Sequence, residues 1–231
     1  MRFFSGYGYA YLFWTALNLL LFPPLSVGGE ADVVVRPLSD RIQVDGMLNE
    51  PIWRLSPSPI RLTQVEPHPG EPPTEDTKVW IAYSKDALYI AVRCEDSSPE
   101  RIVASEMRRD AFLMDNDNIE LVLDTYHDHR NAYYFASNAA GALVDGRITE
   151  NQDAALEWDG IWNVRTRIDD QGWTAEFQPR ALGMGIQYFP LPFPREGNVQ
   201  VVVPHPGHPD LPDRKGRQYK GIRKTIAGRG S

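Results

Sequence analysis

The sequence predicts an all-β protein folded as an antiparallel sandwich. Three observations favour that class. Short segments of alternating apolar and polar residues recur along the chain, turn-forming residues separate them, and no segment of helix length keeps a 3.6-residue apolar period. Many short strands joined by turns are typical of two antiparallel sheets packed face to face. The chain has 231 residues, 42% of them hydrophobic, which is enough to build the core of such a sandwich.

The predicted strands follow one another along most of the chain. They are the β-branched or aromatic segments 32–36, 41–45, 78–83, 87–93, 118–124, 131–138, 142–148, 161–168 and 172–178. Residues 49–53 are predicted to form a short helical turn, with Asn49 as its cap and Pro51 in its first turn. Six prolines between positions 57 and 73 predict a loop or an edge segment, because proline cannot donate to a strand ladder.

The first 29 residues have the order of a secretory signal. Arg2 is the only charged residue before Glu30, an apolar run covers residues 10–22, and small residues at 26–29 supply a cleavage zone. We therefore expect export to the periplasm, the outer membrane or the exterior of the cell. An uncleaved anchor is the alternative, although the run is shorter than the ~20 residues of a membrane span.

Charge divides the rest of the chain into an acidic domain, residues 30–178, and a basic tail, residues 179–231. The tail holds eight prolines and nine Lys or Arg residues against three acids, a net charge of +6. The whole chain carries −7, which leaves −13 for the residues before the tail. We predict a disordered tail, with a functional basic arm as the alternative. The acidic balance argues against nucleic acid as a partner, because phosphate binding needs clustered Lys and Arg.

Four motifs stand in order along the predicted domain. They are IQVDGMLNEPIW at 42–53, ALYIAVRCED at 87–96, DNDNIELVLD at 115–124 and GWTAEF at 172–177. From Arg41 to Gln178 the chain therefore resembles a family 9 carbohydrate-binding module. Residues 124–133 are most similar to a subset of that family, which is found at the N-terminus of large exported bacterial proteins, ahead of a region that looks like an outer-membrane barrel.

The resemblance implies a jelly-roll-like sandwich, frequently with structural calcium, that binds carbohydrate on its surface or end loops. Because relatives are accessory domains of glycoside hydrolases such as xylanases, it also implies a role in polysaccharide breakdown beside an attached or partner enzyme. A structural or interaction domain of an outer-membrane protein, with a degenerate sugar site, is the alternative.

The family continues past its closing motif with a further strand, whereas this chain reads Gln178-Pro179-Arg180. We therefore expect a truncation or frame shift near Gln178, and the loss of the last strand.

Carbohydrate binding needs flat aromatic rings for the apolar face of a pyranose and planar polar groups for its hydroxyls. Strand alternation predicts that Trp80, Tyr89, Arg93 and Glu120 share one polar-aromatic sheet face, because the residues between them have the pattern of a buried face. A cross-strand ion pair between Arg93 and Glu120 is the alternative interpretation of those two residues.

The family resemblance adds further candidates. Arg93 lies on the strand that carries the family's arginine contact, and Trp158, in a loop-like stretch, is the predicted stacking platform. Asn138 and Glu75 correspond to other sugar contacts of the family. The predicted carbohydrate site is thus Arg93, Trp158, Trp80, Glu120, Asn138 and Glu75.

Asp110, Asp115 and Asp117 form an oxygen-rich stretch just before a predicted strand. Calcium takes ~6–8 oxygen ligands from bendable loops, so these three carboxylates are candidate ligands of a structural calcium ion. The spacing differs from that of an EF-hand, which has a glycine and a final glutamate at fixed positions. A solvated acidic loop is the alternative.

Catalysis within this chain is not expected. The sequence holds no G-x-S-x-G, no HExxH and no phosphate-binding P-loop.

Similar sandwiches also bind haem through an axial methionine and an axial histidine, and they then serve in electron transfer. Met107, Met114, His127 and His129 make a haem-binding module a further alternative.

Overall fold

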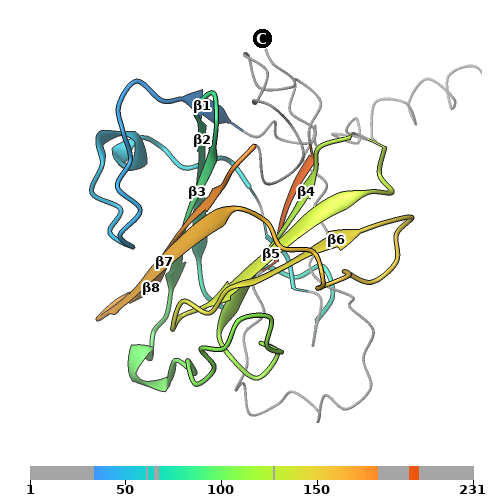
Figure 1. Ribbon diagram of the computed structural model, residues 1–231. Coiled ribbons are helices and arrows are strands. Elements are labelled where there is room, and N and C mark those ends of the chain that lie inside the picture. Colours follow the sequence, from blue (N-terminus) through green and yellow to red (C-terminus); the bar gives the residue numbers. More distant parts are fainter. Residues whose placement is uncertain (1–33, 61, 65–67, 127, 182–197, 203–231) are drawn as a thin grey trace, which may run out of the picture. The chain divides into compact units, whose positions relative to one another are not determined.

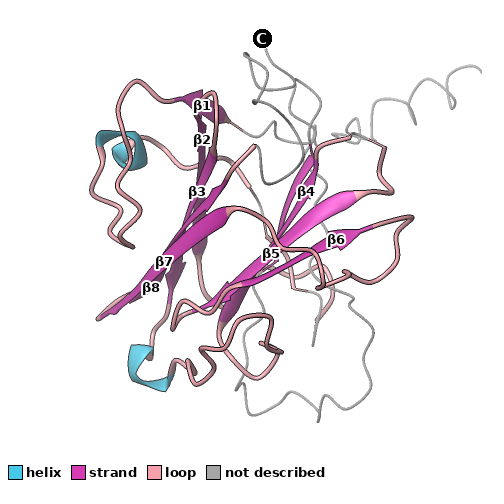
Figure 2. Cartoon of the chain, viewed as in Figure 1, coloured by secondary structure: helices cyan, strands magenta, loops and turns pink. Residues whose placement is uncertain are grey.

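The computed structural model describes residues 34–60, 62–64, 68–126, 128–181 and 198–202. Nine strands and two short 3₁₀ helices lie in this part of the chain (Figures 1 and 2). Their bounds are β1 Val35–Pro37, η1 Pro51–Arg54, β2 Thr77–Tyr83, β3 Leu88–Glu95, η2 Pro99–Arg101, β4 Asn118–Asp124, β5 Ala132–Asn138, β6 Val144–Ile148, β7 Trp162–Asp169, β8 Gly172–Pro179 and β9 Asn198–Val202. No helix among these residues is long and apolar enough to cross a membrane.

The strands form two sheets. The first sheet has the order β1-β2-β3-β8-β7, and the second has the order β6-β5-β4-β9. Neighbouring strands are antiparallel except β1 and β2, which are parallel. Figure 1 shows the first sheet on the left, facing the second on the right. The all-β, jelly-roll-like sandwich that the sequence predicts is therefore confirmed, and the seven predicted strands from residue 78 to residue 178 agree with β2 to β8 within two residues at either end.

Alternation along the strands builds a core between the sheets. Ile81 and Ile90 point inward from the first sheet, Leu121 and Phe135 point inward from the second, and all four are at most 1% exposed. The ring of Phe135 lies edge-on to that of Trp162 in the first sheet, with 5.2 Å between their centroids. Burying a side chain of this size stabilises a fold by ~1.5–3 kcal/mol. The shared core therefore holds the two sheets together.

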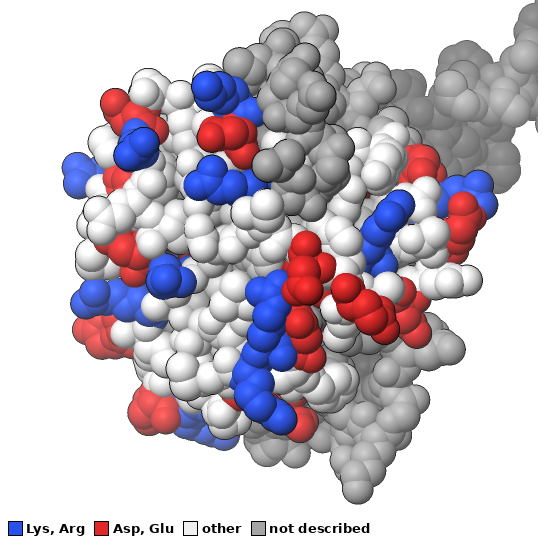
Figure 3. All heavy atoms as spheres, in the orientation of Figure 1, with Lys and Arg blue, Asp and Glu red and all other residues white. Residues whose placement is uncertain are grey.

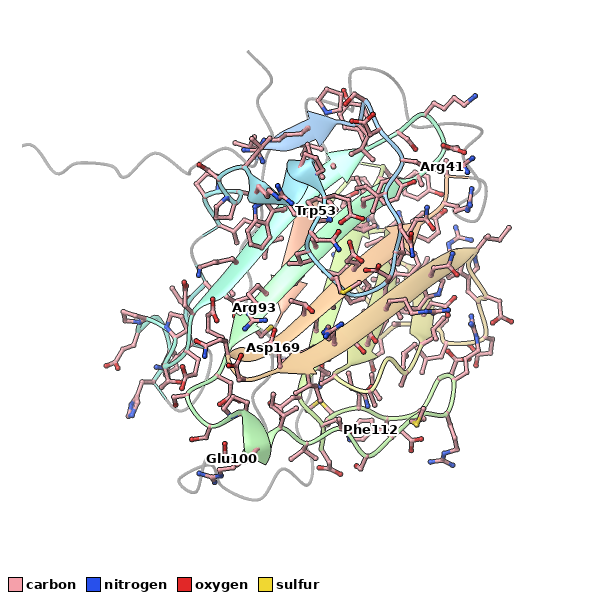
Figure 4. All side chains as sticks on the ribbon, turned by 90° about the vertical axis from the view of Figure 1, so that its left-hand side faces the viewer. Arg41, Trp53, Arg93, Glu100, Phe112 and Asp169 are labelled. Carbon is pink, nitrogen blue, oxygen red and sulfur yellow. The ribbon has the colours of Figure 1, made fainter. Side chains whose placement is uncertain are left out.

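Residues 38–55, which we call the N-terminal segment, cover part of the outer face of the first sheet. Ile42 and Trp53 from this segment pack against Trp80 and Tyr89 from the sheet, in an apolar cluster separate from the main core. Figure 4 shows this outer face, with Trp53 lying over the strands near one end. The first sheet is therefore buried on both faces where the segment crosses it.

Two predictions for the N-terminal segment are corrected. Residues 41–45 form no strand, because two backbone N–H groups at the end of this stretch bond to the side chain of Glu176 rather than to a neighbouring strand. The predicted helical turn is confirmed as η1, but its cap position is Glu50 and not Asn49. The apolar alternation of residues 41–45 thus reflects packing on a sheet face.

Strand β9 overturns the expectation that the last strand is missing. Residues 198–202 pair antiparallel with β4, in a register that runs from Glu120–Val202 to Asp124–Asn198. The valines of β9 have high strand propensity, which the surrounding prolines and basic residues obscure in the sequence. The start of the predicted tail is also ordered, because Pro179 ends β8 and residues 180–181 follow it. The predicted signal and residues 182–197 and 203–231 of the predicted tail lie outside the described residues.

Candidate functional site

The predicted carbohydrate residues do not form one site, and two aromatic candidates are covered. Trp80 is 9% exposed beneath the N-terminal segment, and its indole Nε1 donates a hydrogen bond to the carbonyl of Leu55 at 2.8 Å. Tyr89 is 8% exposed in the same cluster, and its hydroxyl accepts a hydrogen bond from Gln178 at 2.9 Å. Neither ring is free to stack on a sugar while the segment lies over it.

Arg93 is engaged by two carboxylates of its own chain. Its terminal nitrogens donate to both carboxylate oxygens of Asp169 at 2.6 and 2.8 Å, and its Nε donates to Glu95 at 3.2 Å (Figure 4). Glu95 also accepts a hydrogen bond from Lys78 at 2.8 Å. The hydrogen bonds from Arg93 lower the pKa of Asp169. Arg93 is therefore the centre of an ion-pair network that joins β2, β3 and β7.

Glu120 belongs to the other side of the sandwich. It alternates with the buried side chains of β4 in the second sheet, whereas Arg93 alternates with those of β3 in the first. Trp80, Tyr89 and Arg93 do share the outer face of the first sheet, as predicted, but Glu120 does not belong to that face, and the alternative Arg93–Glu120 ion pair is wrong. Alternation tells which residues of one strand share a face, but not which sheet that strand joins. Glu120 is 8% exposed, and burial raises its pKa to about 7.

Asn138 and Glu75 hold loops. Asn138 is 0% exposed, and its Nδ2 donates to the carbonyl of Glu106 at 2.7 Å and to Oδ1 of Asn116 at 3.0 Å. These bonds anchor the connection between η2 and β4. Glu75, just before β2, accepts a hydrogen bond from the hydroxyl of Ser97 at 2.6 Å. Each side chain is thus committed to a contact within its own chain.

Trp158, unlike the other predicted carbohydrate residues, lies in a cluster of aromatic rings at the edge of the sandwich. It lies in the loop that joins β6, an edge strand of the second sheet, to β7, an edge strand of the first. Its ring centroid lies 4.9 Å from that of Tyr133 and 6.0 Å from that of Phe135, both on β5. Tyr133 stacks in turn on Tyr126 at 6.3 Å, and their hydroxyl oxygens are 3.1 Å apart. Tyr126 is 54% exposed, so the rings run from the core to the surface.

A cluster of charged side chains adjoins Trp158. Arg109 donates to Asp145 at 2.5 Å and lies 2.9 Å from Asp159. Asp145 is 0% exposed and also accepts the backbone N–H of Gly160 at 2.5 Å. Burial raises the pKa of Asp145, and the hydrogen bond from Gly160 and the charge of Arg109 oppose that shift. We define the edge site as Tyr126, Tyr133, Trp158, Arg109, Asp145 and Asp159.

Gly160 brings the aromatic and charged parts of the edge site together. A Cβ atom at this position would lie 2.7 Å from Cη2 of Trp158 and 3.3 Å from Oδ2 of Asp145. The indole therefore occupies space that any other residue at position 160 would need. The run Trp158-Asp159-Gly160 thus sets where the indole lies relative to the buried carboxylate.

Sequence reasoning finds only Trp158 among the edge-site residues. Tyr133 alternates with buried residues on β5, so its sequence pattern is that of a core residue. Arg109 and Asp145 are 36 residues apart, and no local pattern joins them. The available signal was the run Trp158-Asp159-Gly160, which sets an aromatic residue beside an acid and a glycine in a loop.

The three predicted calcium ligands do not converge. Asp110 lies 3.4 Å from Arg109, Asp117 is buried and accepts the backbone N–H of Val103 at 2.7 Å, and Asp115 is exposed. Among the described residues, no three His, Cys, Asp or Glu side chains gather as they would around a metal ion. Calcium also binds carbonyl and amide oxygens, so a calcium site in this region stays a prediction.

The haem alternative stays a prediction. Met107 is 74% exposed and the side chain of His129 is 62% exposed. His127 lies outside the described residues.

Motif residues that carry the family resemblance make contacts within the fold. Gly172 has a φ of +129°, and a Cβ there would collide with the carbonyl oxygen of Cys94. Gly46 has a φ of +84°, and a Cβ there would lie 2.9 Å from the backbone of Thr166. Both positions require glycine for its freedom at positive φ and for the close approach. The glycines of these motifs are thus explained by the fold and lie apart from the edge site.

The sequence matches no family model and no curated protein. Solved structures that are similar to this chain include two family 9 carbohydrate-binding modules and one further protein. A proposed carbohydrate-binding protein from Bacteroides uniformis ATCC 8492 has a TM-score of 0.47 and 12% identity, over 64% of this chain and 69% of that one. A family 9 carbohydrate-binding module from Caldicellulosiruptor kristjanssonii, solved with cellotriose, has a TM-score of 0.48 and 11% identity, over 74% of this chain and 75% of that one.

A family 9 module from the same organism, solved with glucose, has a TM-score of 0.49 and 12% identity, over 75% of this chain and 78% of that one. Two of the three structures thus belong to the family that the sequence motifs resemble. At these identities and TM-scores the likeness carries no inference about a ligand. A ligand for this chain has to be argued from the edge site.

Proposed function

We propose that this chain is a carbohydrate-binding module that holds an oligosaccharide or polysaccharide at the edge site. One observation carries the proposal: Trp158 packs on Tyr133 and lies beside the ion pair of Arg109 and Asp145. Aromatic rings cover the apolar face of a pyranose, and planar charged groups bond its hydroxyls in pairs. Both kinds of group adjoin each other here.

Some residues of the edge site can contact a ligand, and one positions another residue. Tyr126 is 54% exposed, and the side chains of Arg109 and Asp159 are 41% and 76% exposed, so these three groups can meet a ligand. A pyranose ring stacks against the aromatic surface, while the guanidinium and the carboxylate exchange hydrogen bonds with its hydroxyls. Asp145 is fully buried and holds the guanidinium of Arg109, so it is a positioning residue.

The charge around the edge site favours a neutral saccharide. Residues 149–161, which include Trp158, hold four acids and no Lys or Arg. Acidic groups close to the site repel a uronate or a sulfated sugar. On the face drawn in Figure 3, acidic and basic side chains of the described residues are interspersed rather than gathered by sign. We therefore expect neutral glycans to bind in preference to anionic ones.

The wider setting is part of the same proposal. The order of residues 1–29 supports export, and the family resemblance supports a place beside an attached or partner glycoside hydrolase in polysaccharide breakdown. Association with the outer membrane through a further C-terminal region is proposed on the resemblance alone. In this setting the module keeps its partner close to an insoluble substrate.

A structural or interaction domain is the second candidate function. One observation favours it: Asp169 and Glu95 accept hydrogen bonds from Arg93. Arg93 is the residue that matches the family's arginine contact. An arginine held in this way has fewer hydrogen bonds to offer a sugar. The second candidate predicts a well-folded protein that binds no glycan.

Calorimetric titration tests the proposal. We expect cellotriose or another neutral oligosaccharide to bind, and an oligogalacturonate of similar length to bind at least several-fold more weakly. Trp158→Ala and Tyr126→Ala should each lower the affinity about tenfold, because stacking contributes roughly 0.5–1.5 kcal/mol per aromatic pair beyond its buried area. Arg109→Ala should lower the affinity to a similar degree.

Arg108 offers a matched control for Arg109. It is the next residue in the chain, its side chain is 83% exposed, and its ion pair is with Glu106. Arg108→Ala removes the same charge and should leave the affinity unchanged. If a folded wild-type protein binds nothing on a glycan array that includes plant and bacterial polysaccharides, carbohydrate binding is wrong and the structural role is favoured.

A further inference from the structure

Arg147 lies at the rim of the second sheet, beside the aromatic rings of the edge site. It belongs to β6, an edge strand of that sheet (Figure 1), and it pairs with Tyr133 of β5. Directly opposed residues of two antiparallel strands point to the same face, with Cβ atoms roughly 4.5–5.5 Å apart. Tyr133 points into the sandwich and is 4% exposed, whereas Arg147 is exposed. The side chain of Arg147 therefore projects from the face that carries the ring of Tyr133 and reaches solvent.

The guanidinium of Arg147 is available to a ligand. Among the described residues it has no hydrogen-bond partner and no carboxylate within the 4.0 Å of an ion pair. By contrast, Arg109 and Arg130, two other arginines near the aromatic rings, each have a carboxylate partner. Burial raises the pKa of Tyr133 to about 12, and the charge of Arg147 opposes that shift, as expected of a guanidinium near the phenol ring. A guanidinium in this position keeps its N–H donors for a ligand.

The aromatic rings and the polar groups of the edge site follow one another in the same order. The ring of Trp158 lies 4.9 Å from that of Tyr133, which in turn lies 6.3 Å from that of Tyr126. Trp158 adjoins Asp145 at one end of this row, and Tyr126 is at the other end. Asp145 and Arg147 are two positions apart on β6, a rise of roughly 7 Å. The site is therefore elongated, with an aromatic ring and a charged group at either end.

We propose that Arg147 and Tyr126 form a second subsite of the edge site, which takes a second sugar residue of the same chain. This subsite rests on the proposed function, in which Trp158 and Arg109 hold the first sugar residue. The ligand is then an oligosaccharide of two or more units, and Arg147 is a specificity-determining residue. A monosaccharide bound beside Trp158 leaves the second subsite empty.

The chemistry of the two ends differs. At the Trp158 end, Arg109 donates hydrogen bonds and the side chain of Asp159, which is 76% exposed, accepts them. At the Tyr126 end, Arg147 supplies donors only, since a guanidinium has no acceptor atom. Arg147 therefore suits two neighbouring hydroxyl oxygens, while the exposed ring of Tyr126 covers the apolar face of the sugar. Because the two ends are not interchangeable, a saccharide chain binds in one direction.

A solvated charge is the competing role for Arg147. Charged side chains on an edge strand hinder its pairing with a strand of another molecule. In that role Arg147 contributes nothing to saccharide binding, and its removal changes the affinity for no chain length. The two roles therefore differ in a quantity that titration measures.

Calorimetric titration of the full chain with sugars of increasing length tests the second subsite. The probes are glucose, cellobiose and cellotriose, with xylose, xylobiose and xylotriose as a second series. We expect a disaccharide to bind about tenfold more tightly than its monosaccharide, because it adds hydrogen bonds to a charged group. Arg147→Ala should lower the affinity for the di- and trisaccharide about tenfold and leave the affinity for the monosaccharide unchanged.

Further variants identify the cause of this loss. Arg147→Lys keeps the charge but loses the planar pair of donors, so it should restore only part of the affinity. Arg167→Ala is the matched control, because Arg167 is an exposed arginine on another edge strand, β7, and shares the outer face of the first sheet with Arg93. It should bind every sugar as the wild type does. Trp158→Ala, in contrast, should weaken the binding of all lengths.

The outcomes separate the second subsite from the proposed function. Binding that weakens in Trp158→Ala but is unchanged in Arg147→Ala would keep the edge site and overturn the second subsite. An equal loss of mono- and disaccharide affinity in Arg147→Ala, or a similar loss in Arg167→Ala, would also overturn it, because net charge would then be the cause. If the folded wild type binds neither series, the second subsite is wrong, while the glycan array still decides the proposed function.

Discussion

Gly160 shows how a single residue without a side chain decides the geometry of the edge site. Its backbone N–H is bonded to Asp145, and its missing Cβ leaves room for the indole of Trp158. Asp145 in turn holds Arg109. The aromatic and the polar halves of the site are thus coupled through one position of the chain.

We predict that Gly160→Ala lowers both stability and saccharide affinity. The added methyl group meets the indole at 2.7 Å, so the ring or the loop has to move. Overpacking of this kind costs about 1–3 kcal/mol, which thermal unfolding measures, and the displaced ring should lower the affinity measured by calorimetry.

A double variant isolates the contact. In a Trp158→Ala background the methyl group meets no indole, so Gly160→Ala should then cost much less stability than in the wild type. An equal cost in both backgrounds would show that the clash with the ring is not the cause.

At the scale of elements, the network around Arg93 joins three strands of the first sheet. The guanidinium spans from β3 to Asp169 at the end of β7, and Glu95 links it to Lys78 on β2. Only 14% of the Arg93 side chain is exposed, against 38% for Asp169. A partly screened pair of this kind stabilises a fold modestly, typically by ~0–1 kcal/mol.

We predict that Arg93→Ala lowers the free energy of unfolding by about 1 kcal/mol and leaves saccharide affinity unchanged. Because the pKa of Asp169 is lowered, the stabilisation is present above its ordinary value of 3.8 and is lost as the pH falls through the lowered one. Denaturant unfolding at pH 7 and pH 3 should therefore show a larger effect at pH 7.

Arg165→Ala is the control for this variant, since Arg165 is exposed on the same sheet face and forms no described ion pair. It should leave stability nearly unchanged. A large loss of affinity in Arg93→Ala alone would move the carbohydrate site from the edge of the sandwich to this face.

At the scale of the whole molecule, the buried carboxyl groups make the fold more stable in acid than in base. Burial raises the pKa of Glu120 to about 7 and that of Glu176 to about 6, both from 4.5. The two groups lie in different sheets, so their effects should add. Each contributes stability that is complete below pH 4.5 and is lost as the pH rises through its raised pKa.

We predict that the free energy of unfolding falls by roughly 2–4 kcal/mol between pH 5 and pH 8. Denaturant titrations at constant ionic strength measure this fall. Glu120→Gln should remove more than half of it, since Glu120 has the larger shift, whereas Glu100→Gln should not change it. A profile that is flat or rises between these pH values would contradict the assignment.

The strands were predictable because their signals are local. In β4 the inward residues Ile119, Leu121 and Leu123 alternate with outward ones, and this period of two is visible in the sequence itself. The same signal misleads at residues 41–45, where alternation serves packing on a sheet face. The strand signal is also too weak to be recognised at 198–202, because prolines lie close by on both sides of this segment.

Of the proposed carbohydrate site, only Trp158 was predictable from the sequence. Trp80 and Arg93 have suitable chemistry, but the N-terminal segment covers one and Asp169 engages the other. Both facts depend on residues distant in the chain. Chemistry can therefore be read from single residues, whereas availability to a ligand depends on what the fold lays over them.

The sequence by itself determined the all-β class, the order of strands β2 to β8 and the acidic balance before the tail, because alternation, turn residues and charge are properties of short segments. Only the tertiary structure decided that Glu120 and Arg93 lie on opposite sides, that β9 completes the second sheet, and that Arg109 and Asp145 meet beside Trp158. Sheet membership and ion pairing join distant segments, and they depend on how the whole core packs.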